Sequence, residues 1–547
     1  MFTTRRKFYA ILLIAALLLG FSGLFLFADA RERILLRNNF LLGTAVLGIS
    51  LPLGTLLGVT TARTDLPGRR LLSLWLAVSL LTPLHLLAAA WQMGLGPQGW
   101  LAYLDKVWVT PWFDSWTAAI TVHCVAAIPW VAWLVGSAAR RSERAVEESA
   151  LLEAPPLTVI CRVLLPQLRP ALAIAALLVA SQVLTEIAVT DFFRIRTWAE
   201  EVYVNINVGS WDAIQGTQPP GVTAKPIDAD VISANWLSPV QLALGGMLFL
   251  SWSILLWYAL SSLRRAQLKT IHEPWRYAWG RWRAVAGTIW IGFLFAVLVF
   301  PLSNLMLKTG WVVTRVAKDF ERTWSLMKVL QMTFGSLSRY RAELVTSFTT
   351  AALAATLGLL LIVALQWLVR KYSLWLNPGL WLTLAILVIP GPVVGLLLIS
   401  VFNHPALSWL HPLYDRTLAV VALAQLLRVW PWMWGVVATT FTTVGRGQLE
   451  QAELEGARPG FVLRKILWPQ LWPSWLLAWL LGFELALGEL AATILVAPPG
   501  QSPLSVRLFT LLHSDQEAEV AGLCLLLILL HAAGLGGISW LWKRMSK

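Results

Sequence analysis

Two polar segments, 147–170 and 450–473, are copies of one another, and this duplication constrains the fold more than any other feature of the chain. The first segment reads EESALLEAPPLTVICRVLLPQLRP and the second reads EQAELEGARPGFVLRKILWPQLWP. They align at an offset of 303 residues, which is the separation of Pro166 and Pro469. A repeat of this length predicts two similar halves in one chain. The matching pairs are Glu147/Glu450, Leu151/Leu454, Ala154/Ala457, Pro156/Pro459, Val159/Val462, Leu164/Leu467, Pro166/Pro469, Gln167/Gln470, Leu168/Leu471 and Pro170/Pro473.

The second copy predicts a helix, a bend and a short amphipathic helix. Residues 450–455 are good helix formers, and Gly456 adopts at little cost the left-handed conformation that ends a helix. Pro459 suits the first turn of a new helix, because a proline lacks the N–H that would be unpaired there. Pro469 marks a break before the next apolar segment. We therefore expect an exposed ridge that a partner can contact.

This pattern is similar to the EAA loop of ATP-binding-cassette (ABC) importer permeases. In that family the loop is a coupling helix that seats in a cleft of a separate ATPase subunit. The resemblance implies a type I ABC importer permease fold and two copies of a partner ATPase, which binds the ATP and Mg²⁺, so no cofactor is expected on this chain. The residues that match the motif are Glu450, Ala452, Gly456, Ala457, Ile466 and Pro469, with Pro459 opening the second helix.

The first copy departs from the motif. Glu147, Ala154, Pro156 and Pro166 keep their places, but Ser149 replaces an alanine. In addition, Glu153 stands where the motif has glycine. We therefore expect the two loops to make unequal contacts with the ATPase, and whether the first loop couples is left open.

The composition predicts an integral membrane protein. Hydrophobic residues make up 57% of the chain and charged residues 13%, whereas charged residues are about 25% of an ordinary soluble domain. The net charge of +14 does not indicate nucleic-acid binding, because the basic residues lie in short loops between apolar segments, as membrane topology requires. The three cysteines show no metal-ligand spacing, and no metal site is expected.

Twelve apolar stretches are long enough to cross a bilayer, which takes about 20 helical residues. We predict an all-α integral membrane protein with two tandem six-helix repeats, 1–268 and 283–547, joined by a basic, aromatic connector at 269–282. The first stretch is expected to be a retained helix rather than a cleaved signal peptide. The predicted spans are 8–28, 40–60, 71–92, 117–136, 170–193, 239–262, 284–306, 344–368, 379–402, 417–440, 473–496 and 518–541.

Lysine and arginine in the loops predict cytoplasmic N- and C-termini and place both EAA-like loops inside. The insert 197–238 is acidic, so it is expected outside, where it is either a contact for a substrate-delivery protein or a plain surface connection. Two basic loops, 29–39 and 308–342, fall outside by parity and disagree with the charge rule.

Two glutamates are related by the same offset of 303 residues and lie within or beside predicted spans. Glu186 and Glu489 each follow their loop proline by twenty residues, which is about 30 Å along a helix. With Thr190 and Thr493 they are candidates for the translocation path, since a carboxylate at membrane depth usually faces a cavity or a partner. They favour a cationic substrate, such as ferric iron or an amine. The alternative is that each caps a helix or pairs with an arginine.

The stretch after Glu489, ATILVAPPGQSPLSVRLFTLLHSDQEAEVAGL, resembles more narrowly the fused two-half permeases of the iron(III) and thiamine importer type. This resemblance implies a bacterial inner membrane location and a periplasmic or lipoprotein substrate-binding protein as a second partner. The chain has no G-x-x-x-x-G-K-[ST] motif, so ATP hydrolysis is expected on another polypeptide and the chain is not expected to be an enzyme.

Two other classes stay open. A secondary transporter driven by an ion gradient has a similar number of spans, but it does not need a duplicated cytoplasmic element. A glycosyltransferase-like membrane enzyme needs external carboxylates, for which Asp212, Asp228 and Asp230 are the candidates.

Overall fold

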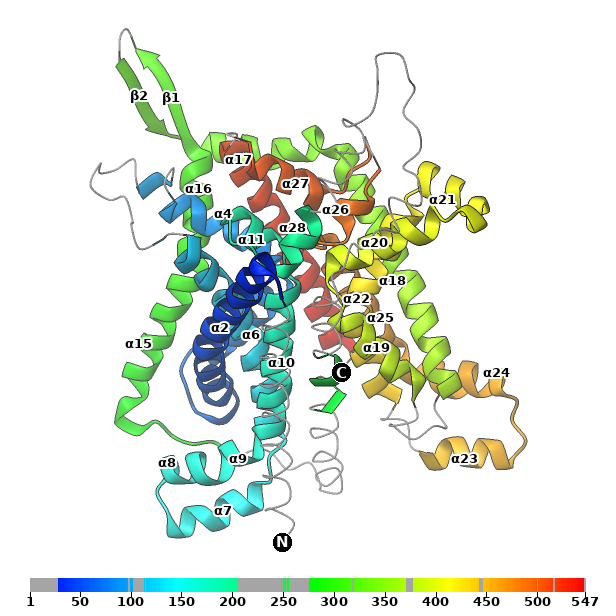
Figure 1. Cartoon of the computed structure of the whole chain (residues 1–547). Coiled ribbons are helices and arrows are strands. Elements are labelled where there is room, and N and C mark those ends of the chain that lie inside the picture. Colours follow the sequence, from blue (N-terminus) through cyan, green and yellow to red (C-terminus); the bar gives the residue numbers. More distant parts are fainter. Residues whose placement is uncertain are drawn as a thin grey trace. The chain divides into compact units, whose positions relative to one another are not determined.

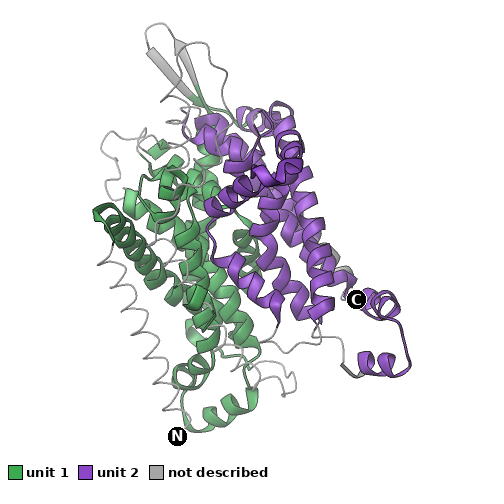
Figure 2. Ribbon diagram, turned by 45° about the vertical axis from the view of Figure 1, so that its right-hand side comes forward, with its two compact units in different colours: residues 1–326 green, residues 327–547 purple. Residues whose placement is uncertain are grey.

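The structure is a computed structural model. It describes residues 28–96, 99–101, 113, 115–204, 247, 249–251, 253–254, 275–316, 319–369, 377–441, 446–498, 500–514 and 517–545. Residues 8–27 of the predicted span 8–28, most of span 239–262, and Asp212, Asp228 and Asp230 lie outside these residues. The chain divides into two compact units, residues 1–326 and 327–547, which Figure 2 colours separately.

Unit 1 is helical apart from one β-hairpin in the part that the structure describes (Figure 1). Its long helices are apolar on most faces, as expected for segments surrounded by lipid and by one another. Its elements are α2 (Ala30–Arg63), α3 (Arg69–Leu81), α4 (Leu84–Leu95), α6 (Ser115–Arg140), α7 (Arg144–Glu153), α8 (Pro156–Val159), the π-helical turn η1 (Ile160–Leu164), α9 (Leu165–Gln167), α10 (Arg169–Thr185), α11 (Ala188–Phe192), η2 (Gly280–Trp282), α15 (Arg283–Leu294), η3 (Phe295–Val299), α16 (Phe300–Gly310), β1 (Trp311–Val316) and β2 (Asp319–Trp324).

Unit 2 repeats much of this order. Its helices α18, α19, α20, α22 and α25 follow one another as α2, α3, α4, α6 and α10 do in unit 1. The elements are α17 (Leu326–Arg339), α18 (Arg341–Val369), α19 (Pro378–Val388), α20 (Gly391–Phe402), η5 (Pro405–Leu410), α21 (His411–Arg416), α22 (Ala419–Phe441), α23 (Arg446–Leu454), α24 (Pro459–Phe461), η6 (Val462–Leu467), α25 (Trp468–Leu487), α26 (Thr493–Val496), α27 (Leu504–Leu512) and α28 (Glu517–Met545).

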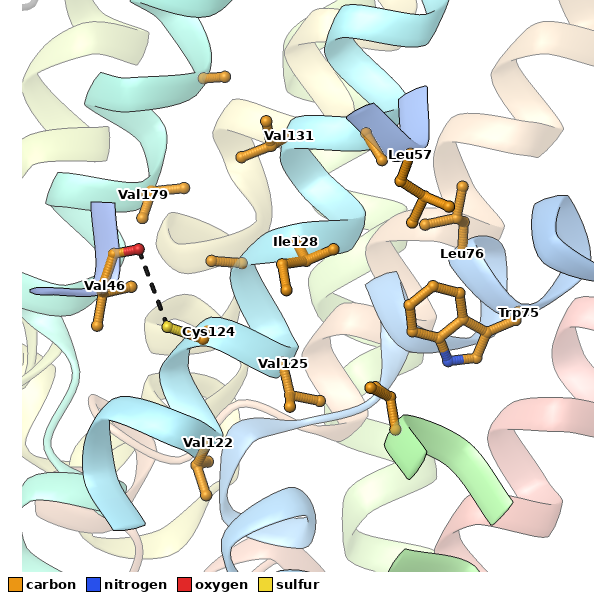
Figure 3. Close-up of a cluster of buried hydrophobic side chains, with 14 of the residues drawn as sticks. Val46, Leu57, Trp75, Leu76, Val122, Cys124, Val125, Ile128, Val131 and Val179 are labelled. Carbon is orange, nitrogen blue, oxygen red and sulfur yellow. Dashed lines mark hydrogen bonds between the residues drawn. The ribbon is translucent and has the colours of Figure 1, made fainter. Parts of the chain in front are cut away.

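The core of unit 1 is built on the pair α2 and α6. A side chain on Gly58 of α2 would lie 2.6 Å from the carbonyl oxygen of Ala132, so the two backbones approach as closely as small residues permit. Around this contact a cluster of buried apolar side chains joins α2, α3, α6 and α10, as Figure 3 shows. The labelled members are Val46, Leu57, Trp75, Leu76, Val122, Cys124, Val125, Ile128, Val131 and Val179.

Two predicted spans are not single straight helices. Span 71–92 is the pair α3 and α4, bent by 107°, and span 379–402 is the pair α19 and α20, bent by 108°. The bends fall at Pro83 and Pro390, where a proline follows an extended residue and interrupts the ladder of hydrogen bonds. The described residues contain six helices long and apolar enough to cross a membrane, or up to nine if each bent pair is one span. The count of twelve stays a prediction.

The segment 308–342, which the sequence predicts as a plain loop, holds regular structure. Strands β1 and β2 pair antiparallel, with Trp311 opposite Trp324, and α17 follows them. This hairpin departs from the all-α prediction. Residues 30–39, also predicted as loop, are the first turns of α2, with Asp29 as the capping residue.

The end of α2 that holds Asn38 lies beside the start of the predicted insert. Arg31 forms an ion pair with Glu201, and Asn38 Nδ2 donates to the carbonyl oxygen of Arg196 at 2.9 Å. Residues 29–39 and 196–201 therefore lie at the same end of unit 1, as the predicted topology requires. Residues 198–204 are helical rather than loop, and 205–238 lie outside the described residues.

The boundary between the compact units does not coincide with the predicted connector. Helices α15 and α16 follow the connector in sequence but lie in unit 1. Asn304 of α16 fixes this packing, because its Nδ2 donates to the carbonyl oxygen of Ala90 at 3.1 Å and its Oδ1 accepts from Trp100 Nε1 at 2.8 Å. The boundary between the two sequence repeats at 269–282 was inferred from the sequence alone, and it stays a prediction.

Candidate functional site

The second polar loop has the predicted helix, bend and helix. Helix α23 ends in a Schellman arrangement: the N–H of Gly456 donates to the carbonyl oxygen of Glu453 at 3.1 Å, and the N–H of Ala457 donates to that of Ala452 at 2.9 Å. Gly456 has φ +76°, which confirms the left-handed conformation expected there. Pro459 begins α24, as expected. The carbonyl groups at the helix end are thus satisfied without any partner.

The bend of the second loop presents apolar side chains to the outside. Leu454 is 89% exposed just before the turn, and Phe461 is 56% exposed just after it. Glu450 and Pro469 are also exposed, while Ala452 is buried and faces the rest of unit 2. Ile466 is half-buried, so only one side of this segment packs against the unit. In Figure 1, α23 and α24 lie at one end of α18, α22 and α25, with α20 and α21 at the other end.

The first polar loop turns by a different device. Glu153, which replaces the glycine, is the last residue of α7, and Ala154 follows in an extended conformation with φ −143°. Pro155 and Pro156 then start α8, since proline favours the first turn of a helix. The corner again carries apolar side chains, because Leu152 is 89% exposed and Leu157 is 72% exposed. Both loops therefore offer one large apolar side chain on each side of their turn.

Glu147, the motif glutamate of the first loop, is buried in a cluster that we call the Glu147 clamp: Arg63, Ser142, Glu147 and Tyr277. The Glu147 carboxylate accepts from Arg63 Nη2, from Ser142 Oγ at 2.8 Å and from Tyr277 Oη at 2.6 Å. Both members of the ion pair are fully buried, and Arg63 also donates to the carbonyl oxygen of Ala139 at 2.7 Å. Three donors around one buried carboxylate satisfy its charge.

The clamp ties the connector to the first loop. The N–H of Tyr277 donates to the carbonyl oxygen of Arg63 at 2.7 Å, and Asp65 accepts from the N–H of Trp279 at 2.9 Å. Next to Tyr277, the ring of Trp275 lies 5.7 Å from the Arg144 guanidinium carbon on α7. Burial, and then the hydrogen bond to Glu147, raise the pKa of Tyr277 well above its usual value, so its hydroxyl remains a donor. In unit 2 the matching Glu450 is exposed, so the two loops differ here.

Glu186 caps a short helix at the end of α10. Its Oε1 accepts from the N–H of Ala188 at 2.6 Å, and its Oε2 accepts from that of Val189 at 3.0 Å. His123 Nε2 on α6 lies 3.6 Å from Oε2. Thr190 is fully buried, and its hydroxyl lies 3.2 Å from the carbonyl oxygen of Ile187.

Glu489 does the same in unit 2. Its Oε1 accepts from the N–H of Ala492 at 2.9 Å, and its Oε2 accepts from the N–H and the hydroxyl of Thr493. Arg428 Nε on α22 lies 4.0 Å from Oε1 and also donates through Nη1 to the carbonyl oxygen of Ile389, at the bend between α19 and α20. Each glutamate therefore has the capping role that the sequence left as the alternative. Their part in a translocation path stays a prediction.

Several partners were not expected from the sequence. Arg63 and Tyr277 carry the clamp, although the sequence indicated only that they belong to a basic loop and to an aromatic connector. In unit 2, Glu484 of α25 is buried and lies 2.7 Å from Nδ1 of the buried His531 on α28. These pairs join residues 47 to 130 positions apart, and a single sequence carries no signal for such distances. Among the described residues, no three His, Cys, Asp or Glu side chains form a metal-binding group.

Comparison with known proteins favours an ABC importer permease over a secondary transporter or a membrane enzyme. Residues 50–208 match the model of the family described as "Binding-protein-dependent transport system inner membrane component". This match, with the relatives described below, supports a permease component of a binding-protein-dependent ABC transport system. The matched residues of the permease contain the whole first loop and Glu186, whereas the second loop lies beyond residue 208.

Curated relatives cover part of the permease. It is 28% identical over 187 residues to the putative 2-aminoethylphosphonate transport system permease protein PhnV of Salmonella typhi, which is 34% of this chain and 68% of that protein. It is 26% identical over 263 residues to the probable sulfate transport system permease protein cysT of Zygnema circumcarinatum, which is 46% of this chain and 85% of that protein. These relatives are named as permease proteins of transport systems, and the expectation that this chain is not itself an enzyme stays a prediction.

Proposed function

We propose that the permease forms the path for a small solute through a bacterial inner membrane and is driven by two copies of a separate ATPase. The observation that carries this proposal is the pair of polar loops, each with an exposed apolar side chain on either side of its turn. Leu152 and Leu157 present this surface on the first loop, and Leu454 and Phe461 present it on the second. Large apolar groups on an otherwise polar, exposed corner are typical of a protein contact.

In this proposal ATP and Mg²⁺ bind to the ATPase, and the loops 147–170 and 450–473 carry its motion to the helices above them. The termini and both loops lie on the cytoplasmic side. A periplasmic or lipoprotein substrate-binding protein delivers the solute from the other side. The two contacts are unequal, because the first loop is held by the buried Glu147 clamp whereas Glu450 of the second loop is exposed and available to the ATPase.

We infer that the substrate is a small ionic solute. The case for ferric iron rested on the carboxylates of Glu186 and Glu489, and both accept hydrogen bonds from backbone N–H groups in helix caps. The relatives are named for 2-aminoethylphosphonate and for sulfate, so these two solutes are the first to test. The amino group of 2-aminoethylphosphonate is a cation, so this solute also agrees with the cationic substrate that the sequence favours. Ferric iron and thiamine are the next to test, as implied by the resemblance in sequence.

The test is co-purification of the permease with its candidate ATPase, followed by ATPase assays in proteoliposomes. Leu454→Asp and Leu152→Asp should each reduce ATPase recovery, because each places a charge in an apolar contact, and the Leu454 variant should show the greater loss of stimulated activity. Glu455→Gln, exposed beside the second turn, is the matched control and should behave as wild type. Solute uptake driven by an ion gradient without any ATPase would refute the proposal and favour a secondary transporter.

A further inference from the structure

A hollow of about 470 Å³ lies in unit 1 where the connector meets the helices near the first loop. It opens at the C-terminal end of α2, the start of α3 and the end of α6. Its lining is polar and basic, with four arginines from three separate segments of the chain. The lining residues are Thr61, Ala62, Arg69, Arg70, Ser73, Arg140 and Arg276.

The four arginines of this hollow, Arg69, Arg70, Arg140 and Arg276, have no acidic neighbour in its lining. None of them forms an ion pair with a residue that the structure describes. The nearby acids are already engaged: Glu147 lies in the clamp, and Asp65 accepts from the N–H of Trp279 and lies 3.6 Å from Arg283 Nε. Four like charges around one hollow repel one another, so this arrangement favours a bound anion.

The start of α3 adds to the positive potential. This helix has thirteen residues, its capping position is Gly68 with no side-chain hydrogen bond, and its first turn contains no acid. Its first two residues are Arg69 and Arg70, although the N-terminal end of a helix favours negative charge. An anion in the hollow would neutralise both the arginines and the exposed N–H groups at this end.

The surroundings of the hollow indicate a lipid rather than a soluble anion. On α3, Leu71 and Leu74 are exposed and each directly follows in sequence a residue that lines the hollow, Arg70 and Ser73. Exposed apolar side chains on the helix that carries part of the basic lining suit acyl chains beside a charged headgroup. Arg276 comes from a segment 136 residues beyond Arg140 and still lines the same hollow.

We propose that this hollow binds the phosphate group of an anionic phospholipid. The guanidinium groups that line the hollow donate to the phosphate oxygens. Because Arg276 lies between Trp275 and Tyr277, the bound lipid holds the connector against α3 and supports the Glu147 clamp. The inference depends only on unit 1 and does not rest on the proposed transport function.

The experiment measures binding of phosphatidylglycerol to the detergent-solubilised full chain by native mass spectrometry and by thermal protection. Phosphatidylcholine and inorganic phosphate are the two comparison ligands. Arg69→Gln with Arg276→Gln should weaken phosphatidylglycerol binding by about 25-fold, since each arginine at an anionic surface contributes about fivefold. The matched control is Arg162→Gln with Arg281→Gln, which removes two exposed arginines of unit 1 that do not line the hollow.

Retention of phosphatidylglycerol by the control variant and its loss by the hollow variant would support the proposal. Equal binding by the two variants would overturn it. Protection by inorganic phosphate as strong as that by phosphatidylglycerol, and lost in the hollow variant, would overturn the lipid source and assign a soluble phosphate instead. If the double variant does not fold, Arg70→Gln alone gives the same comparison with a single expected loss of about fivefold.

Discussion

Replacing Glu147 by Gln tests whether the first loop is held by a buried charge. The substitution removes the only acidic partner of Arg63 in the clamp and leaves a fully buried guanidinium with two neutral acceptors, the carbonyl oxygen of Ala139 and Ser142 Oγ. Removing one member of a buried ion pair costs about 3 to 5 kcal/mol. We expect the lower end, about 3 kcal/mol, because the one carbonyl oxygen of glutamine can still accept from Tyr277 while its NH2 group donates to Ser142 Oγ. That is a large part of the about 5 to 15 kcal/mol that stabilises a typical folded protein.

The assay is a denaturant titration of the purified chain in detergent micelles, followed by tryptophan fluorescence. The control is Glu148→Gln on the same helix, where the exposed carboxylate pairs with Arg144 at 2.7 Å and the expected loss is at most about 1 kcal/mol. The double variant Glu147→Gln with Arg63→Met should be more stable than Glu147→Gln alone, because no unpaired charge remains. A loss no larger than that of Glu148→Gln, or a double variant less stable than Glu147→Gln alone, would refute the reasoning.

Two further predictions concern unit 1. Gly58→Ala should destabilise it by about 1 to 3 kcal/mol through overpacking of α2 on α6, whereas Gly43→Ala, with open space around it, should not; thermal unfolding of both compares them. Burial, followed by Asp191 and Glu201, raises the pKa of Glu200 to about 7 from 4.5. The folded state therefore holds this proton more tightly, and stability present below pH 4.5 is lost as the pH rises to about 7. Glu200→Gln should remove this loss from the stability profile, and an unchanged profile would contradict the assignment.

The helices and the second loop were predictable because their signals are local. An apolar run of about 20 residues predicts a span wherever it occurs, and Gly456 followed by Pro459 predicts a helix end and a new start. The duplication at an offset of 303 residues predicted that both halves carry a loop of this kind. The bends of over 100° were harder to foresee, because proline alone does not decide them. Pro52 and Pro129 lie inside continuous helices, while Pro83 and Pro390 begin new ones.

The chemistry of the first loop was not predictable, because it depends on distant partners. From the sequence, Glu147 is predicted to be a motif residue on a polar helix. Its contacts with Arg63 and Tyr277 arise only in the folded structure. The same holds for Glu186 and Glu489, whose spacing predicted a shared depth but whose hydrogen-bond partners are the backbone N–H groups just beyond them. The first N–H groups of a helix lack a partner within that helix, and these nearby carboxylates accept from them.

The position of α15 and α16 matters for any attempt to divide this protein. A protease cut or a split gene near residue 270 would leave fragments 1–268 and 269–547, yet the second fragment begins with helices that pack in the first compact unit through Asn304 and its neighbours. The two fragments should therefore remain associated without a covalent link. The first would expose the apolar surface of α4 if it were made alone, so the halves of this chain are units of sequence but not units of independent folding.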